Sequence, residues 1–88
     1  MRLDKFLKIS LLFKTRSSAE KAIEDGLVLL NEKVGKPAST VNVGDSLVII
    51  TPFKKTSYEI LMLPGDNNVS KQAAKELFKM KGEEKFDI

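Results

Sequence analysis

The stretch TRSSAEKAIEDG, residues 15–26, predicts a short helix with well-defined ends. Ser17 followed three residues later by Glu20 fits a capping box, in which each side chain accepts a hydrogen bond from the other residue's backbone N–H. Gly26 is a typical residue to end the helix, because glycine tolerates the left-handed backbone that often follows a helix C-cap. We therefore predict a helix from Ser17 to about Asp25.

The beginning of this helix carries more polar side chains than a cap needs. Thr15, Arg16 and Ser17 stand together before the first turn. A helix N-terminus presents unpaired backbone N–H groups and the positive end of the helix dipole, and both favour a phosphate or another anion. The stretch therefore predicts an anion-binding helix end, and a structural cap without a ligand is the alternative interpretation.

The first residues of the chain predict another amphipathic helix, from Arg2 to about Leu12. A stripe of three leucines, with Leu11 as its last member, recurs at helical spacing and is expected to pack. On roughly the opposite side Arg2, Lys5 and Lys8 recur every third residue. A lysine-rich helix face is often only solvated.

Basic side chains are concentrated at this end of the chain. Residues 1–21 hold six lysine or arginine side chains and two acidic ones, whereas the net charge of the whole chain is only +3. Such asymmetry predicts that the N-terminal part meets a polyanion.

The composition excludes several kinds of chemistry. The 88 residues contain neither cysteine nor histidine, which leaves no thiol nucleophile, imidazole base, disulfide or thiolate metal site. No pair of carboxylates or lysines stands beside a plausible nucleophile. We therefore predict a protein that is not an enzyme and has no cofactor or metal. The apolar runs are too short to span a membrane, so we expect a cytoplasmic protein that makes no membrane contact.

Short β-type runs follow Gly26. The segments LVLL, SLVIIT and YEILML predict strands, with NEK as a tight turn and PFKKTS as a connection. The connections are too short for helical crossovers, so the sheet is predicted to be antiparallel.

The C-terminal part predicts one more helix. Ser70 is a suitable N-cap for a helix that runs to about Met80 and ends at Gly82, with the tail EEKFDI loose beyond it. Lys71, Lys75 and Lys79 would form a stripe on that helix, which we interpret first as a solvated face. The whole chain is thus predicted to be an α+β domain. The break PGDNN divides it into residues 1–66 and a C-terminal helix and tail over residues 67–88.

Several short motifs stand in a fixed order in the first 31 residues: RLDK from Arg2, TRSSA from Thr15 and GLVLLN ending at Asn31. Their order and spacing resemble the S-four RNA-binding domain, a family of α+β domains in which two helices form an L-shaped unit packed on a small antiparallel sheet. The matched positions are Arg2, Leu3, Asp4, Lys5, Leu7, Thr15, Arg16, Ser17, Ala19, Ile23, Gly26, Val28 and Asn31. One departure is Glu32, where the family usually has glycine.

The resemblance implies that the basic side of the helix pair contacts RNA backbones. The residues to which it assigns this contact are Arg2, Lys5, Lys8, Arg16 and Ser17. We add Thr15, Lys33 and Lys36 to the candidate RNA-binding set. Contacts of this kind recognise folded RNA mainly by its shape. Asp4 is expected to orient a neighbouring basic group or to favour the helix N-terminus, and not to bind RNA itself.

Within the family, the chain is similar to small bacterial proteins of ribosome-associated quality control. That likeness implies binding to the rRNA of a large ribosomal subunit that carries peptidyl-tRNA. It also implies support for C-terminal alanine tailing of the stalled chain, together with an RqcH-like tailing factor. We expect a monomer off the ribosome. Two alternatives stay open, a heat-shock-type factor that recycles the same subunit and a basic protein-interaction module.

Overall fold

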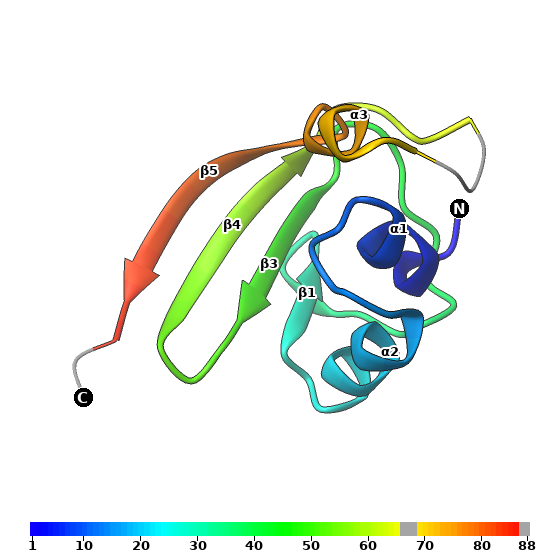
Figure 1. Ribbon diagram of the computed structural model, residues 1–88. Coiled ribbons are helices and arrows are strands. Elements are labelled where there is room, and N and C mark those ends of the chain that lie inside the picture. Colours follow the sequence, from blue (N-terminus) through cyan, green and yellow to red (C-terminus); the bar gives the residue numbers. More distant parts are fainter. Residues whose placement is uncertain (66–68, 87–88) are drawn as a thin grey trace.

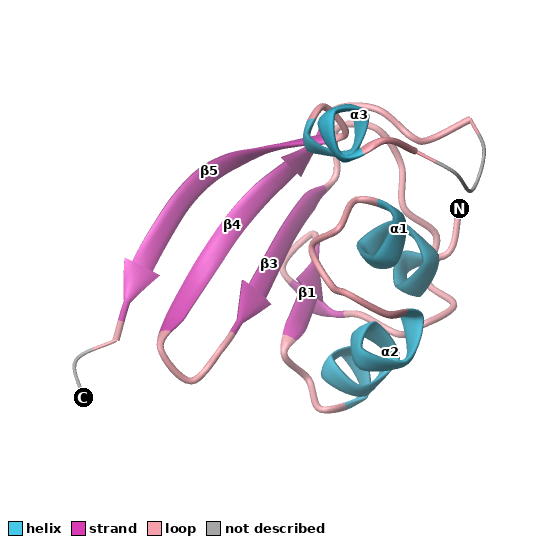
Figure 2. Cartoon of the chain, viewed as in Figure 1, coloured by secondary structure: helices cyan, strands magenta, loops and turns pink. Residues whose placement is uncertain are grey.

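The computed structural model describes residues 1–65 and 69–86, which form two N-terminal helices, a five-stranded antiparallel sheet and a short third helix (Figure 1, Figure 2). The helices are α1 (Leu3–Ile9), α2 (Arg16–Glu24) and α3 (Lys71–Lys75). The strands are β1 (Val28–Leu30), β2 (Lys33–Val34), β3 (Ser46–Ile50), β4 (Lys54–Ile60) and β5 (Phe78–Lys85). The predicted α+β class and antiparallel sheet are confirmed.

Each strand of the sheet pairs antiparallel with its neighbours, in the order β2-β1-β3-β4-β5. β1 and β2 form a hairpin through the predicted tight turn, where Asn31 and Glu32 have φ angles of 52° and 70°. Positive φ at both central residues is the mark of a type I′ turn, which matches the twist of the two strands. Glu32 therefore stands at a position that favours glycine.

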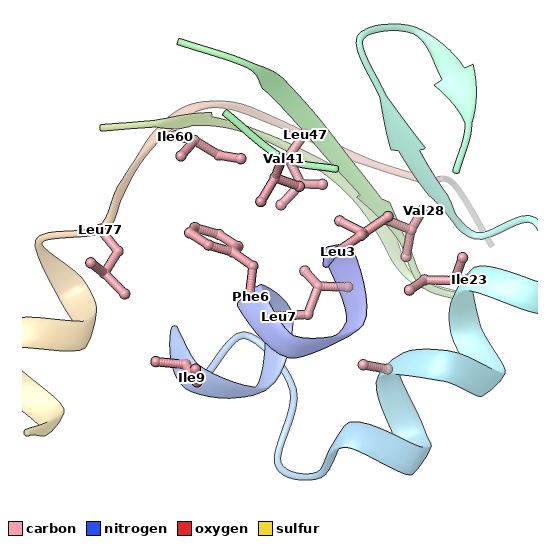
Figure 3. Packing of buried hydrophobic residues seen from close by; sticks show 11 residues of the cluster. Leu3, Phe6, Leu7, Ile9, Ile23, Val28, Val41, Leu47, Ile60 and Leu77 are labelled. Atoms are coloured by element: carbon pink, nitrogen blue, oxygen red, sulfur yellow. The ribbon is translucent and has the colours of Figure 1, made fainter. Parts of the chain in front are cut away.

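The buried core lies between the helices and one face of the sheet (Figure 3). Leu3, Phe6 and Leu7 of α1 are fully buried and point toward the strands, with Phe6 facing Ile60. Leu77, which follows α3, is only 4% exposed and belongs to the same cluster. The C-terminal part of the chain thus shares the core of the N-terminal part.

The first helix is shorter than its sequence pattern predicts. α1 ends at Ile9, the Ser10 hydroxyl donates to the carbonyl oxygen of Leu7 at 3.2 Å, and Leu11 has a φ of 63°. Its left-handed backbone turns the Leu11 side chain away from the packed stripe, and half of the residue is exposed. The prediction that Leu11 packs with the other leucines is wrong.

The second helix ends as predicted. The N–H of Gly26 donates to the carbonyl of Ile23, and the N–H of Leu27 donates to that of Ala22, both at 3.0 Å. With a φ of 77° at Gly26, this pair of bonds is a Schellman motif. The bonds satisfy carbonyl groups that a helix end would otherwise leave unpaired.

The predicted C-terminal helix is mostly a strand. Ser70 does cap a helix, accepting from the N–H of Ala73 at 3.1 Å, but α3 covers only the five residues after it. β5 then pairs with β4 along its length, so Gly82 lies inside a strand and Lys79 stands apart from the α3 lysines. The predicted lysine stripe does not form. The open edge of β4 offers hydrogen bonds that outweigh a weak local preference for helix.

Two further sequence predictions differ from the structure at the same sheet. The last four residues of PFKKTS are already part of β4, which ends at Ile60. The first three residues of the predicted loose tail, Glu83 to Lys85, belong to β5. The proposed division between residues 66 and 67, and the last two residues of the tail, lie outside the described residues.

β4 and β5 extend well beyond the helices as a curved arm (Figure 1). The molecule is accordingly elongated, with extents of 39 × 22 × 22 Å. The helix pair covers one end of the sheet, and the arm leaves both faces of its far end open.

Candidate nucleic-acid interface

The helix pair is organised around the carboxylate of Asp4, which has no exposed surface. Arg2 donates to it from Nε to Oδ1 at 3.2 Å and from Nη2 to Oδ2 at 3.1 Å. Arg16, the first residue of α2, donates from Nε to Oδ2 at 3.2 Å. The backbone N–H of Lys5 completes the set at 2.8 Å. One buried acid therefore holds two arginines from the two helix starts, as the sequence led us to expect of Asp4.

This arrangement keeps Asp4 ionised. Burial alone would raise its pKa, but the hydrogen bonds from Arg2 and Arg16, the Lys5 amide and the charge of Arg16 together lower the pKa from its ordinary value of 3.8. A buried carboxylate that accepts several hydrogen bonds from cations favours its charged form. The pair of arginines is thus fixed by a charge that persists at neutral pH.

Both arginines remain accessible from outside. Their side chains are 50% and 47% exposed, although each is bound to the fully buried Asp4. Arg16 Nε also lies 3.7 Å from Oε1 of Glu20. Asp4 engages Arg16 only through Nε, and no other described residue accepts a hydrogen bond from the terminal NH2 groups of that guanidinium. Guanidinium groups suit phosphates, since they can donate two parallel hydrogen bonds.

A shallow hollow of about 240 Å³ lies between the two helices. Its lining residues are Lys5, Lys8, Ile9 and Arg16. Three of the four are cations, and among the described residues neither lysine forms an ion pair. The structure therefore gathers three predicted site residues around one concave, positively charged surface. Ile9 was missed by the sequence analysis, although its position four residues after Lys5 places it on the same side of α1.

The cap of α2 differs from the prediction. Thr15 is the N-cap, and its Oγ1 accepts from the backbone N–H of Ser18 at 3.0 Å. Ser18 Oγ in turn accepts from the N–H of Thr15 at 3.3 Å, so these two residues form the capping box. The predicted box of Ser17 and Glu20 is wrong by two residues. Three residues with short hydroxyl side chains, Thr15, Ser17 and Ser18, lie at this helix start, and sequence spacing alone did not show which of them is the cap.

The corrected cap changes the roles available to two candidate residues. The hydroxyl of Thr15 also donates to Ser18 Oγ at 3.0 Å, so it is committed to the helix end. Ser17 is exposed in the first turn, and its hydroxyl makes no hydrogen bond to another described residue. Ser17 is therefore the free polar group beside Arg16.

The two remaining candidates lie outside the hollow. Lys36 is exposed on a loop whose carbonyl groups at Pro37 and Ser39 accept from the first backbone N–H groups of α1, at 3.2 and 2.8 Å. It therefore stands near the start of α1. Lys33 is exposed on the edge strand β2, paired with Leu30. The structure brings Lys33 into no contact with the hollow.

Gly35 allows the loop before Lys36 to approach the helix closely. A Cβ atom there would lie 2.7 Å from Cδ2 of the fully buried Leu3. Only glycine fits this spacing without displacing the core side chain. The position of the loop is thus fixed by a packing contact at the base of α1.

Other kinds of site find no support in the described residues. Over residues 1–65 and 69–86, histidine, cysteine, aspartate and glutamate side chains form no group of three that could hold a metal ion. Within the same ranges, no helix is long and apolar enough to cross a membrane. What the helix pair offers is a rigid set of cations.

Comparisons with known proteins agree with this kind of surface. Residues 1–47 match the model of the S4 domain. The chain belongs to the S4 domain family, the RNA-binding class that the motifs of its first residues indicated. The match spans α1, α2 and the beginning of the sheet, and it includes every residue that lines the hollow.

Relatives from several bacteria carry the name RQC P-site tRNA stabilizing factor. The one from Halalkalibacterium halodurans is 40% identical over 84 residues, which cover 96% of this chain and 93% of the relative. The one from Listeria innocua is 38% identical over 99% of this chain and 92% of its own length. The one from Bacillus subtilis is 33% identical over 98% of both. The shared name describes a stabilizing factor for P-site tRNA.

A solved structure shares the fold. The Vibrio cholerae Heat Shock Protein 15, described as a trimeric structure, superposes with a TM-score of 0.83 at 26% identity. The similarity covers 92% of this chain and 81% of that one. It therefore includes most of the C-terminal region as well as the helix pair.

Proposed function

We propose that this protein binds RNA backbones through the face formed by α1 and α2. The observation that carries the proposal is the hollow where Lys5, Lys8 and Arg16 meet, beside the two arginines that Asp4 holds. Phosphate contacts supply affinity and register, so a surface of this kind recognises folded RNA by its shape. Its role is to position RNA, without a chemical step.

The candidate residues take different parts in this contact. In the proposed set, the residues that bind phosphates directly are Arg2, Lys5, Lys8 and Arg16. Ser17 adds a hydroxyl group, and Thr15 fixes the start of α2. Lys36 and Lys33 flank the face. Arg16 is the strongest single residue, because its Nε is fixed by Asp4 while its terminal NH2 groups bond to no described residue. A side chain that is already oriented loses less conformational entropy when it binds.

The names of the relatives suggest which RNA is bound. They describe stabilizing factors for tRNA in the ribosomal P site, and the likeness extends over nearly the full length of the chain. We propose that this protein binds the rRNA of a large ribosomal subunit that carries peptidyl-tRNA, in the cytoplasm. It would hold the tRNA in place while an RqcH-like tailing factor adds C-terminal alanine to the stalled chain. Off the ribosome it would be a monomer.

Sedimentation of cell lysate tests this proposal. Wild-type protein is expected to travel with large subunits in a sucrose gradient at low salt, whereas the Arg16→Ala variant stays at the top. Lys21→Ala is the matched control, because it removes one cation from the same helix, where Lys21 pairs with Asp25 at 3.1 Å. Urea unfolding of each variant checks that it is folded. Wild-type protein that stays at the top, with stalled subunits present, would exclude the ribosomal partner.

The sequence left open a heat-shock-type factor that recycles the same subunit without tail synthesis, and the fold shared with Heat Shock Protein 15 keeps this as a second candidate function. Both candidates predict sedimentation with large subunits. The tails distinguish them: cells that lack this protein should lose C-terminal alanine tails on a stalled reporter if it supports tailing. Unchanged tails together with accumulated peptidyl-tRNA on large subunits would favour recycling.

A further inference from the structure

A second hollow, of about 500 Å³, lies on the face of the sheet that points away from the helices. Successive side chains of a strand alternate between the two faces of a sheet. On β3 and β4, Leu47 and Ile60 face the core, so Val48 and Ser57 face the other way. The proposed RNA-binding face and this hollow are therefore on opposite sides of the molecule.

The hollow follows a single row of residues across the sheet. Strand register aligns Val34, Leu29, Val48, Ser57 and Gly82 from one edge to the other. Leu29 and Val48 give the row an apolar floor. Next to them the row continues with Ser57 and Gly82. Because both residues are small, the surface is hollowed over β4 and β5. Both belong to the lining of the hollow.

Two lysines and two hydroxyl groups surround this floor. Lys55 and Lys81 line the hollow, and over the described residues neither forms an ion pair. By contrast the neighbouring Lys54 is paired with Glu83, with Nζ 2.7 Å from Oε1. Ser46 and Ser57 line the hollow as well, and their hydroxyls make no hydrogen bond to another described residue. The site thus offers unpaired cations and hydrogen-bond donors around an apolar patch.

Acidic groups mark the limits of the site. Glu32, on the β1–β2 turn, lines one side of the hollow. An adjoining hollow of about 260 Å³ shares Lys55 and Ser57 but is also lined by Glu83 and Glu84. An anion is therefore favoured between the two lysines and disfavoured toward the tip of the arm.

We propose that this hollow is a second RNA site, in which a single strand lies across the sheet. Lys55 and Lys81 would hold a phosphate with help from the serine hydroxyls, while Leu29 and Val48 contact a ribose or base. Unpaired lysines beside an exposed apolar floor suit a nucleotide chain, which combines anionic and apolar groups at each step. The inference goes beyond the helix face and shares with the proposed function only the class of partner.

The two sites together would let one small molecule bind two RNA segments at once, one on each face. Five hydrogen-bonded strands lie between them, so the sheet would set the distance between the bound segments. This geometry gives the elongated arm a role that the helix pair does not explain.

Amide chemical shifts of isotope-labelled protein, titrated with a single-stranded uridine dodecamer, test the site. Binding should shift the amides of Leu29, Val48 and Gly82, and the double variant Lys55→Ala/Lys81→Ala should abolish those shifts. Shifts that a folded RNA hairpin causes at Lys5 and Lys8 should persist in the double variant. The helix-face amides report on the proposed function separately. Sheet amides that stay unchanged at saturating RNA would overturn the RNA assignment and leave the hollow to a protein partner.

Salt dependence of the affinity, measured by fluorescence anisotropy with the same RNA, supplies a second readout. The double variant should bind more weakly, and the slope of log K against log salt should fall by about 1 for each phosphate-binding lysine removed. Lys71→Ala/Lys75→Ala is the matched control, since it removes two exposed lysines from α3. An equal loss in the control would show general charge attraction and overturn the site.

Discussion

Asp4 is the residue on which the helix face depends, and its acid–base behaviour makes that dependence measurable. Because the pKa of Asp4 is lowered by its partners, it stabilises the fold above its ordinary pKa of 3.8. That contribution is lost as the pH falls through the folded-state pKa. Asp4→Asn should lower the free energy of unfolding by about 2 kcal/mol at pH 7, because it removes a buried charge from two arginines.

Urea unfolding of wild type and Asp4→Asn over a range of pH checks this prediction. The difference in the free energy of unfolding between the two proteins should have its full size at neutral pH. It should shrink as the pH falls below 3.8, the ordinary pKa of the Asp4 carboxyl. A difference that is constant down to strongly acidic pH would mean that the charge of Asp4 contributes nothing.

Glu32 gives a second prediction at the residue scale. With a φ of 70°, it occupies a conformation that glycine adopts more easily. Glu32→Gly should therefore raise the free energy of unfolding by about 0.5–1 kcal/mol. The same substitution at exposed Glu24, the last residue of α2, should lower the free energy of unfolding by up to about 1 kcal/mol, because glycine disfavours helix. Thermal unfolding of both variants tests the opposite signs, and a loss of stability in Glu32→Gly would contradict the type I′ turn.

At the scale of elements, the start of α2 holds Thr15, which caps the helix, and Ser17, which is proposed to bind a phosphate. Thr15→Ala should cost about 1 kcal/mol of stability, because Thr15 caps the helix. Ser17→Ala should leave stability within about 0.5 kcal/mol, since Ser17 is exposed and takes no part in the cap. If Ser17 binds a phosphate, its variant will still weaken RNA binding. Urea unfolding and anisotropy measured on both variants distinguish the two roles, and a larger stability loss in Ser17→Ala would restore the cap predicted from sequence.

The candidate sites differ in how far the sequence could predict them. Lys5 and Lys8 lie within one short helix and Arg2 is its N-cap, so local periodicity predicted their common face. The link from Asp4 to Arg16 crosses between helices, yet the family motif included both residues. Lys55 and Lys81 come together only through strand register, and nothing local in the sequence marks that register. Sites formed within one element are therefore accessible to sequence analysis, whereas this sheet site was not.

At the scale of the whole molecule, the main error in the predicted fold has a non-local cause. Residues 70–80 carry a good N-cap and helical spacing of apolar side chains, and both signals are local. The strand β5 forms instead because β4 presents an edge to it, and Phe78 packs edge-on against Tyr58 with ring centroids 5.3 Å apart. That edge exists only after the rest of the sheet has formed, so the local sequence of residues 70–80 could not reveal it.

Because the C-terminal segment shares the core, we predict that it unfolds together with the rest of the domain. Leu77 is 4% exposed within the main cluster, whereas Met80, three residues later, is 55% exposed. If β5 folds as part of one cooperative unit, Leu77→Ala should lower the free energy of unfolding by about 2–4 kcal/mol, through lost burial and a cavity. Met80→Ala, the matched control on β5, should cost less than about 0.5 kcal/mol. Urea unfolding followed by circular dichroism and by Tyr58 fluorescence should give one coincident transition for each variant. Two separate transitions, or an unaffected Leu77→Ala variant, would mean that the C-terminal segment docks on a core that is stable without it.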